Sequence, residues 1–156
     1  MENTQIIGII PYVRAGLLGQ KSYNVIITNS NLIVAQMTNA MVNEEIKKVR
    51  EESKDKGDGF LKRMASTMTA GYHIHERYFN MTPDQILNEN PENFLISNDS
   101  IKKIRIKMGQ IHEDGRNQPN TIKIVCNNAK YKYTFTQITS KQVKELLSQT
   151  LGSKVK

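Results

Sequence analysis

Residues 101–108 read Ile-Lys-Lys-Ile-Arg-Ile-Lys-Met, and this stretch decides the fold prediction. From Lys103 onward the cations alternate with apolar residues, so an extended chain turns Ile104, Ile106 and Met108 to one side and the cations to the other. The alternation returns at 121–127 and 130–136. These stretches predict three antiparallel strands with one buried face, the last two joined by a tight turn at 127–129. The inward residues are Ile122, Ile124, Cys126, Tyr131, Tyr133 and Phe135.

Further strands are predicted on the N-terminal side of this stretch. Residues 5–14, 22–28 and 32–37 are rich in Ile, Val and Tyr and are separated by a glycine-containing loop and an Asn-Ser turn, which indicates a three-stranded meander. A short strand follows at 94–96. With the three strands of the opening stretch, the sequence predicts about seven antiparallel strands.

Helices are predicted between the third strand and residue 94 and again after the last strand. Residues 39–56 and 60–71 have helical spacing of apolar residues, and Thr82, Pro83 and Gln85 form a capping box that begins a shorter helix ending by Asn90. A final helix runs from Thr139 or Ser140 to Leu151, with Gly152 placed to end it. The tail at 153–156 is predicted to fray.

The string Tyr23-Asn24-Val25-Ile26-Ile27-Thr28-Asn29-Ser30-Asn31-Leu32-Ile33 and the strand at 100–106 resemble those of uncharacterised bacterial and archaeal proteins with a pleckstrin-homology-like domain. The resemblance covers about 100 of the 156 residues in pattern. It implies an α+β, mainly β fold: a partly open barrel of about seven antiparallel strands capped by a C-terminal helix. Residues 38–92 depart from the minimal fold and are interpreted as a helical insertion.

The length of the chain limits the number of domains, and its charge indicates where an anionic partner could bind. A chain of 156 residues with a net charge of +7 fits one domain, residues 1–156. Residues 101–156 hold twelve Lys and Arg against three Asp and Glu, so the positive charge belongs to the last third.

No transmembrane segment or secretory signal is recognised, and the lone Cys126 is interpreted as a buried structural thiol. We therefore expect a cytoplasmic protein, peripheral to the membrane if its partner is a lipid surface.

The predicted strands of the last third bring cations together on their outward face. Because almost no acids lie among them, this face is a candidate site for an anionic partner. The alternative is a solvated face whose lysines protect the sheet edge. The candidate residues are Lys103, Arg105, Lys107, Lys123, Lys130 and Lys132.

A second candidate is the loop at the barrel mouth, with Arg14, Leu17, Leu18 and Lys21. The resemblance implies that phosphoinositide-binding members place an Arg two residues after the second basic position, but Tyr23 stands there, which argues against such binding. The leucines are expected either to enter a membrane interface or to fold over the barrel mouth.

Catalytic and metal motifs are few. His73 and His75 share a face if their segment is extended, which makes them the candidate metal ligands. Further ligands have no evident source except Glu76 or the distant His112. We find no phosphate loop, nucleophile elbow or matched carboxylate pair. The sequence therefore predicts no catalytic residues, no cofactor and no bound metal.

The leading hypothesis is a non-catalytic binding module that recognises a protein partner or an anionic membrane surface. One alternative is a metal-binding protein or small enzyme built around His73 and His75. Another is a nucleic-acid-binding protein that uses the basic sheet face, which is less favoured because Tyr131, Tyr133 and Phe135 are predicted to face the core and not to stack on bases. The helical insertion is a candidate surface for a homo-oligomer.

Overall fold

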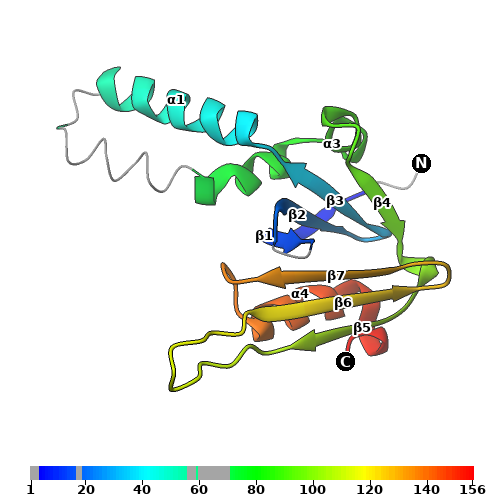
Figure 1. Cartoon of the computed structure of the whole chain (residues 1–156). Coiled ribbons are helices and arrows are strands. Elements are labelled where there is room, and N and C mark those ends of the chain that lie inside the picture. The colour runs from blue at the N-terminus through cyan, green and yellow to red at the C-terminus, as the bar shows by residue number, and fades with distance from the viewer. Residues whose placement is uncertain (1–3, 17–18, 56–58, 60–70) are drawn as a thin grey trace.

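The computed structural model describes residues 4–16, 19–55, 59 and 71–156. Figure 1 shows its elements along the chain. The strands are β1 (Ile6–Ala15), β2 (Lys21–Thr28), β3 (Asn31–Met37), β4 (Phe94–Ser97), β5 (Ile101–Lys107), β6 (Asn120–Cys126) and β7 (Lys130–Phe135). The helices are α1 (Asn39–Asp55), α3 (Pro83–Glu89) and α4 (Ser140–Leu151), with 3₁₀ helices η1 (Gly71–Asn80), η2 (Asn98–Ser100) and η3 (Gly152–Lys154).

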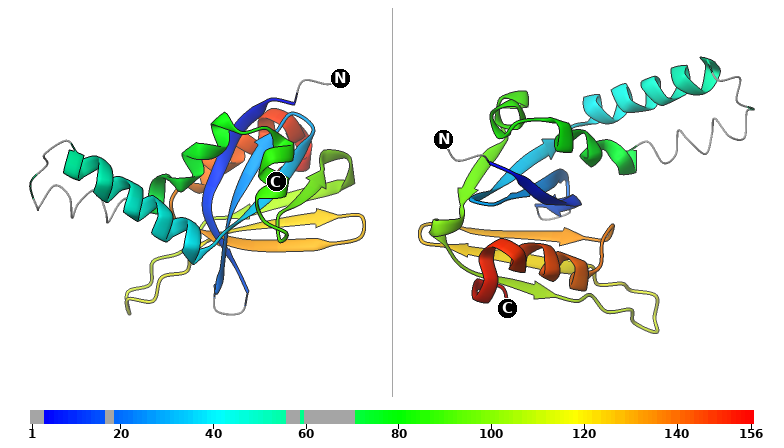
Figure 2. Two further views of the ribbon diagram at one scale, coloured as in Figure 1. Left: turned by 90° about the horizontal axis from the view of Figure 1, so that it is seen from above. Right: turned by 180° about the vertical axis from the view of Figure 1, so that it is seen from behind.

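All seven strands belong to one antiparallel sheet, in the order β4-β3-β2-β1-β7-β6-β5. β1 and β7 meet in register at Arg14 and Thr134. Strands β1–β4 and strands β5–β7 form two layers, which we call the N-terminal half and the C-terminal half (Figure 1). Figure 2 shows α4 lying against one face of β5–β7, which we call the inner face of that half.

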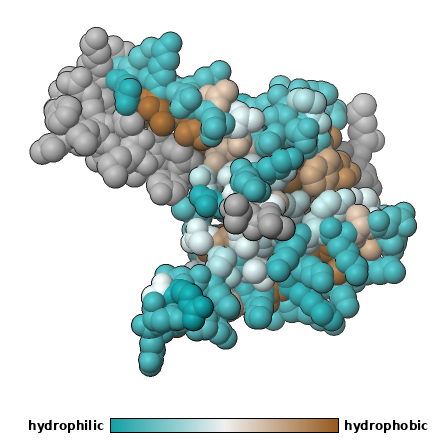
Figure 3. Space-filling view, viewed as in Figure 1, coloured by the Kyte–Doolittle hydropathy of each residue, from teal (hydrophilic) through white to brown (hydrophobic). Residues whose placement is uncertain are grey.

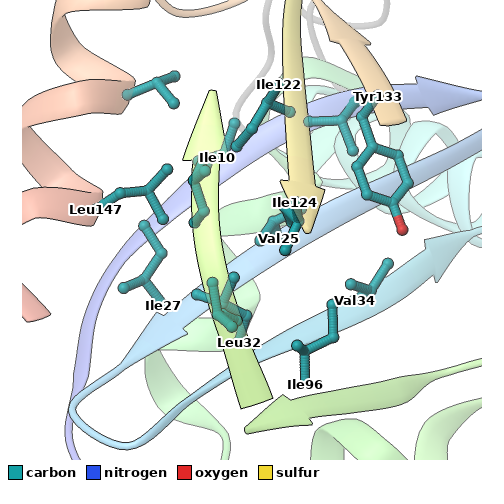
Figure 4. Close-up of a cluster of buried hydrophobic side chains, with 14 of the residues drawn as sticks. Ile10, Val25, Ile27, Leu32, Val34, Ile96, Ile122, Ile124, Tyr133 and Leu147 are labelled. Carbon is teal, nitrogen blue, oxygen red and sulfur yellow. The ribbon is translucent and has the colours of Figure 1, made fainter. Parts of the chain in front are cut away.

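One hydrophobic core joins the two halves and α4. The inward side chains of β2, β3, β5, β6 and β7 meet Val143, Leu147 and Leu151 of α4 there (Figure 4). Aromatic contacts also cross between the halves, because Tyr23 meets Tyr133 edge-on at 5.9 Å and Phe94 stacks on Tyr131 at 5.4 Å. The predicted inward positions are confirmed as buried for Ile104, Ile122, Ile124 and Tyr133, whereas Ile106 is partly buried against the core. Leu147 of α4 is fully buried there and Leu146 partly.

The N-terminal half is covered on its outer face as well. Here Ile9, Ile26 and Ile33, together with Ala35, pack against Tyr78 of η1 and Ile86 of α3 in a second apolar cluster. Residues from 71 to 89 therefore act as a cover for β1–β3. Because both faces are buried, β2 and β3 contain continuous runs of buried residues instead of an alternation.

A polar contact holds this cover in place. The Tyr78 hydroxyl donates to Glu89 Oε2 at 3.2 Å, and Glu89 also forms an ion pair with Arg77. Burial raises the pKa of Tyr78, and the Arg77 charge opposes that shift. The contact links η1 to α3, so the two elements of the cover are tied by charge as well as by packing.

β1 is irregular where it passes from one half toward the other. Its pairing with β2 shifts register between Ile10 and Val13, and Tyr12 has a φ of 56°, in the left-handed region. Such a conformation costs on the order of 1 to 3 kcal/mol in a residue other than glycine. Buried Asn24 offsets part of this cost, because its Oδ1 accepts a hydrogen bond of 3.0 Å from the Tyr12 backbone N–H. The bulge lets β1 bend toward β7.

Two features place α4 against the core: a capping box at its N-terminus and a glycine on β1 beneath it. Thr139 and Gln142 form a capping box at its N-terminus. Leu146 lies directly over Gly8, where a Cβ would be 2.6 Å from Leu146 Cδ2. Glycine at this position therefore allows the helix to approach β1.

The predicted strands are confirmed to within one residue at each end, as are the helix from Asn39, the Thr82 capping box and the final helix. Cys126 is buried, as predicted. Residues 60–70 of the helix predicted at 60–71 lie outside the described residues, and Gly71 begins η1. The prediction that Met108 faces inward was wrong: β5 ends at Lys107, and Met108 is 70% exposed. Within the described ranges, we find no helix with the length and apolar character needed to cross a membrane.

Candidate anion-binding face

The six predicted cations lie on the outer face of the C-terminal half, which we call the basic face. Lys103 is half-buried and the other five are exposed. In Figure 3, hydrophilic side chains gather over β5, β6 and β7, on the side away from α4. The basic face consists of Lys103, Arg105, Lys107, Lys123, Lys130 and Lys132.

Strand register lines three of these cations up in one row. Arg105 pairs with Lys123, and Lys123 pairs with Lys132. Directly opposed residues of neighbouring antiparallel strands share a face, with their Cβ atoms about 5 Å apart. The row therefore concentrates three positive charges across three strands, and like charges in such positions repel one another mildly.

The C-terminal residues extend this row, which the sequence did not predict. The Lys156 backbone N–H donates to Ile104 O at 2.7 Å, and the Ile106 N–H donates to Lys156 O at 3.3 Å. Because Val155 is buried beside Ile104, an extended chain turns the next side chain, Lys156, toward the basic face near Arg105.

The prediction of a frayed tail was therefore wrong. Val155 and Lys156 cover the free edge of β5, and Lys154 Nζ also donates to Asn98 O at 2.9 Å. The apolar Val155 in an otherwise polar tail was the signal that this segment packs.

Neither acids nor exposed aromatics interrupt the basic face. The sequences of β5, β6 and β7 contain no Asp or Glu. Tyr133 and Phe135 are buried on the inner side, and Tyr131 is partly buried there, as predicted. Burial raises the pKa of Tyr133 well above its ordinary value, so this side chain stays neutral within the core. The face thus offers positive charge without a platform for base stacking.

Of the barrel-mouth residues, the structure connects Arg14 to the basic face. Arg14 pairs with Thr134, Thr134 with Thr121, and Thr121 with Lys107. Arg14 therefore continues the Lys107 row onto β1, and its guanidinium lies 5.3 Å from the Tyr12 ring centroid. Lys21 is exposed at the start of β2, whereas Leu17 and Leu18 lie outside the described residues.

Tyr23, two residues after Lys21, is buried. Its side chain contacts Tyr133 in the core. The position at which the resemblance implies a lipid-binding Arg is therefore occupied by a side chain of the core.

The candidate metal ligands were placed on the assumption of an extended segment, which the structure contradicts. Residues 71–80 form the 3₁₀ helix η1. The shared face predicted for His73 and His75 depended on an extended chain, so the structure gives it no support. The side chain of His73 lies outside the described part of the structure. Among the side chains that the structure describes, no group of three or more His, Cys, Asp or Glu residues is placed to hold a metal ion.

We compared the chain with protein-family models, with curated proteins and with solved structures, and none of the three comparisons gave a match.

Proposed function

We propose that the protein is a non-catalytic binding module with a pleckstrin-homology-like fold and a helical insertion between β3 and β4. The strand order β4-β3-β2-β1-β7-β6-β5, followed by a helix that packs into the core, supports this assignment. The elements α1, η1 and α3 all fall within the proposed insertion. A fold alone does not specify a function, and the basic face is the part of this fold that could bind a partner.

The module is proposed to bind an anionic membrane surface through the basic face. The observation that carries this proposal is the cross-strand row Arg105-Lys123-Lys132 on an open face without acids. Five of the six cations are lysines, which carry compact, hydrated charges without the planar fork that arginine uses for paired hydrogen bonds. Such charges suit a diffuse anionic surface, where each one near the lipid contributes about 1 kcal/mol.

The same geometry makes nucleic acid the weaker alternative. Binding of single strands combines positive charge with aromatic side chains on which bases stack. The aromatic residues of β7 are turned to the inner side, and the large exposed apolar residues of the described chain, Phe79, Leu95, Met108 and Ile111, lie outside β5, β6 and β7. Charge alone remains on this face, so nucleic acid could be bound here only through its phosphate backbone.

Charge reversal of the row tests the proposal. We expect the native protein to sediment with vesicles that contain phosphatidylserine and to be released as salt shortens the Debye length. In the triple variant Arg105→Glu, Lys123→Glu and Lys132→Glu, loss of about 3 kcal/mol of attraction should lower vesicle binding by roughly a hundredfold or more. Folding should be nearly unaffected, because these side chains point into solvent.

The matched control reverses three exposed cations of α1, with Lys47→Glu, Lys48→Glu and Arg50→Glu. This change alters net charge by the same amount, so a similar loss of binding in the control would show that only total charge matters and would contradict the proposal. Failure of the native protein to bind phosphatidylserine vesicles at low salt would also contradict it. Salt-sensitive binding to oligonucleotides without vesicle binding would assign the face to nucleic acid instead.

A further inference from the structure

The segment between β5 and β6 is an ordered two-stranded arm. Gln110 and Gln118 exchange backbone hydrogen bonds of 3.1 and 2.8 Å, and Ile111 forms an antiparallel bridge with Asn117. The arm projects from the C-terminal half at the end where β5 stops and β6 starts (Figures 1 and 2). It therefore leaves the body at the margin of the basic face.

The arm continues the pairing of β5 with β6. Lys107 pairs with Thr121, and Ile111 pairs with Asn117. These two pairs are four residues apart on both strands, so the register of β5 and β6 is kept along the arm. Gly109 allows this continuity, because a Cβ there would lie 1.9 Å from Gln118 O. Its backbone N–H instead donates to Asn120 Oδ1 at 2.8 Å. The arm is thus held in register with the sheet that carries the basic face.

Two of the four large apolar side chains exposed in the described chain are on this arm. Ile111 is 88% exposed and Met108 is 70% exposed. Positions 108 and 111 differ by an odd number, so on an extended ribbon the two side chains leave opposite sides. A rigid protein surface against one side of the ribbon would cover only one of them, whereas a fluid apolar layer can surround both.

The turn at the end of the arm contains an ion-paired carboxylate and one further carboxylate, a net charge of −1. Arg116 Nε donates to Asp114 Oδ2 at 2.6 Å, and these hydrogen bonds lower the pKa of Asp114. Gly115 supplies the left-handed residue of the turn, with a φ of 82°. Glu113 is the remaining carboxylate. The turn therefore adds little net repulsion toward an anionic surface, and Lys107 adds attraction at the base of the arm.

We infer that the arm enters the headgroup layer of an anionic bilayer, so that Ile111 on one side of the ribbon and Met108 on the other both contact its apolar boundary. This inference rests on the proposed function: the basic face supplies the electrostatic attraction, and the arm adds contact with the apolar region of the bilayer. Interfacial binding strength scales with buried apolar area together with attraction to anionic lipid, and insertion depths are about 5 to 10 Å. The occupant of this surface is therefore the lipid itself.

A single-tryptophan experiment tests the contact directly, because the chain contains no Trp. We expect the emission of Ile111→Trp and of Met108→Trp to shift to the blue with phosphatidylserine vesicles and to be quenched by lipids brominated on their acyl chains. The matched control is Phe79→Trp, which replaces a 54% exposed side chain on η1, in the cover of the N-terminal half. Its emission should be unchanged.

A second variant measures the contribution to binding. The double variant Ile111→Ser and Met108→Ser should bind phosphatidylserine vesicles about tenfold more weakly, because two apolar contacts are lost. Its salt dependence should be retained, because the basic face is intact. Urea unfolding of each variant checks that the fold is preserved.

The outcomes separate the two proposals. If the native protein does not sediment with phosphatidylserine vesicles at any salt concentration, the proposed function fails and this inference fails with it. If it does sediment, but both arm tryptophans behave like Phe79→Trp and the serine variant binds as well as the native protein, the inference about the arm is wrong while the function of the basic face stands.

Discussion

In the N-terminal half, Ile33 points outward from β3 and is fully buried, whereas in the C-terminal half Lys123 points outward from β6 and is exposed. Both residues belong to one continuous sheet, and both follow the strand alternation. The difference is the cover: η1 and α3 lie over β1–β3, and the outer side chains of β5–β7 are in contact with solvent. One half of the sheet is therefore built for packing, and the other leaves a face available for a partner.

The largest effect expected from this comparison is on stability. Ile33→Ala should lower the free energy of unfolding by about 2 to 5 kcal/mol, because it leaves a cavity between β3 and the cover. Lys123→Ala, at an outward position of the same sheet, should change it by less than about 0.5 kcal/mol. Urea denaturation of the two variants provides the measurement. Equal effects would mean that the two outer faces do not differ in the way described.

A smaller effect is expected from the polar contact within the cover. Tyr78→Phe removes the hydroxyl that donates to Glu89 and should cost about 1 to 3 kcal/mol, as for other hydrogen bonds to charged acceptors. Tyr131→Phe is the control, since Tyr131 is partly buried in the main core and its ring stacks on Phe94. We expect thermal unfolding to show a clear loss for the first variant and little change for the second. The reverse order would rule out the Glu89 contact as a stabilising feature of the cover.

The smallest effect on global stability is expected in the arm. In Gly109→Ala the new Cβ meets Gln118 O, so the two strands of the arm must separate locally. Because the arm lies outside the core, the free energy of unfolding should change by less than about 1 kcal/mol. Hydrogen exchange at the Gln110 and Gln118 amides should accelerate by about tenfold or more.

The matched control for this variant is Gly59→Ala. A Cβ at Gly59 has nothing within 4 Å, so this change should leave exchange at Gln110 and Gln118 as it is in the native protein. If Gly109→Ala leaves the exchange of both amides unchanged as well, the arm is not held by close approach at Gly109.

The C-terminal half was the more predictable of the two. Alternation at 101–107, 121–126 and 130–135 predicted both the buried and the exposed side chains, because one face of this half is packed and the other is wet. The capping box at Thr82 was predicted for a similar reason, since it depends on residues three positions apart. The box at Thr139 has the same spacing but was not predicted. Local sequence spacing is therefore sufficient to predict a feature that depends only on neighbouring residues or on one buried face of a sheet.

Features that depend on contacts distant in sequence were missed. The unbroken apolar runs Val25-Ile26-Ile27 and Leu32-Ile33-Val34-Ala35 indicate strands buried on both faces, but no local pattern says which segment provides the second cover. Likewise, Val155 signals that the C-terminal segment packs, but no local pattern says that it packs beside β5. Met108 was misplaced because alternation continues past the point where the core ends.

The candidate site was predicted in its residues and only partly in its arrangement. All six cations of the basic face were predicted to point outward together. The row of Arg105, Lys123 and Lys132 required the register between strands, which the sequence does not fix across the long 108–119 connection. The connection of Arg14 to this face required the pairing of β1 with β7. The role of the site in binding stays a prediction.

The pairing of Arg14 with Thr134 also bears on how the molecule forms. These residues are 120 positions apart in the chain, so β1 cannot pair with β7 until most of the polypeptide has been made. The β1–β2–β3 meander can assemble early from local contacts, whereas the pairing of β1 with β7 carries the entropy cost of closing a long loop. Pairings between residues so distant in sequence slow folding. During synthesis on the ribosome, the edge of β1 that pairs with β7 stays unpaired until β7 has been made. This interval is when a nascent chain is most exposed to aggregation through that edge.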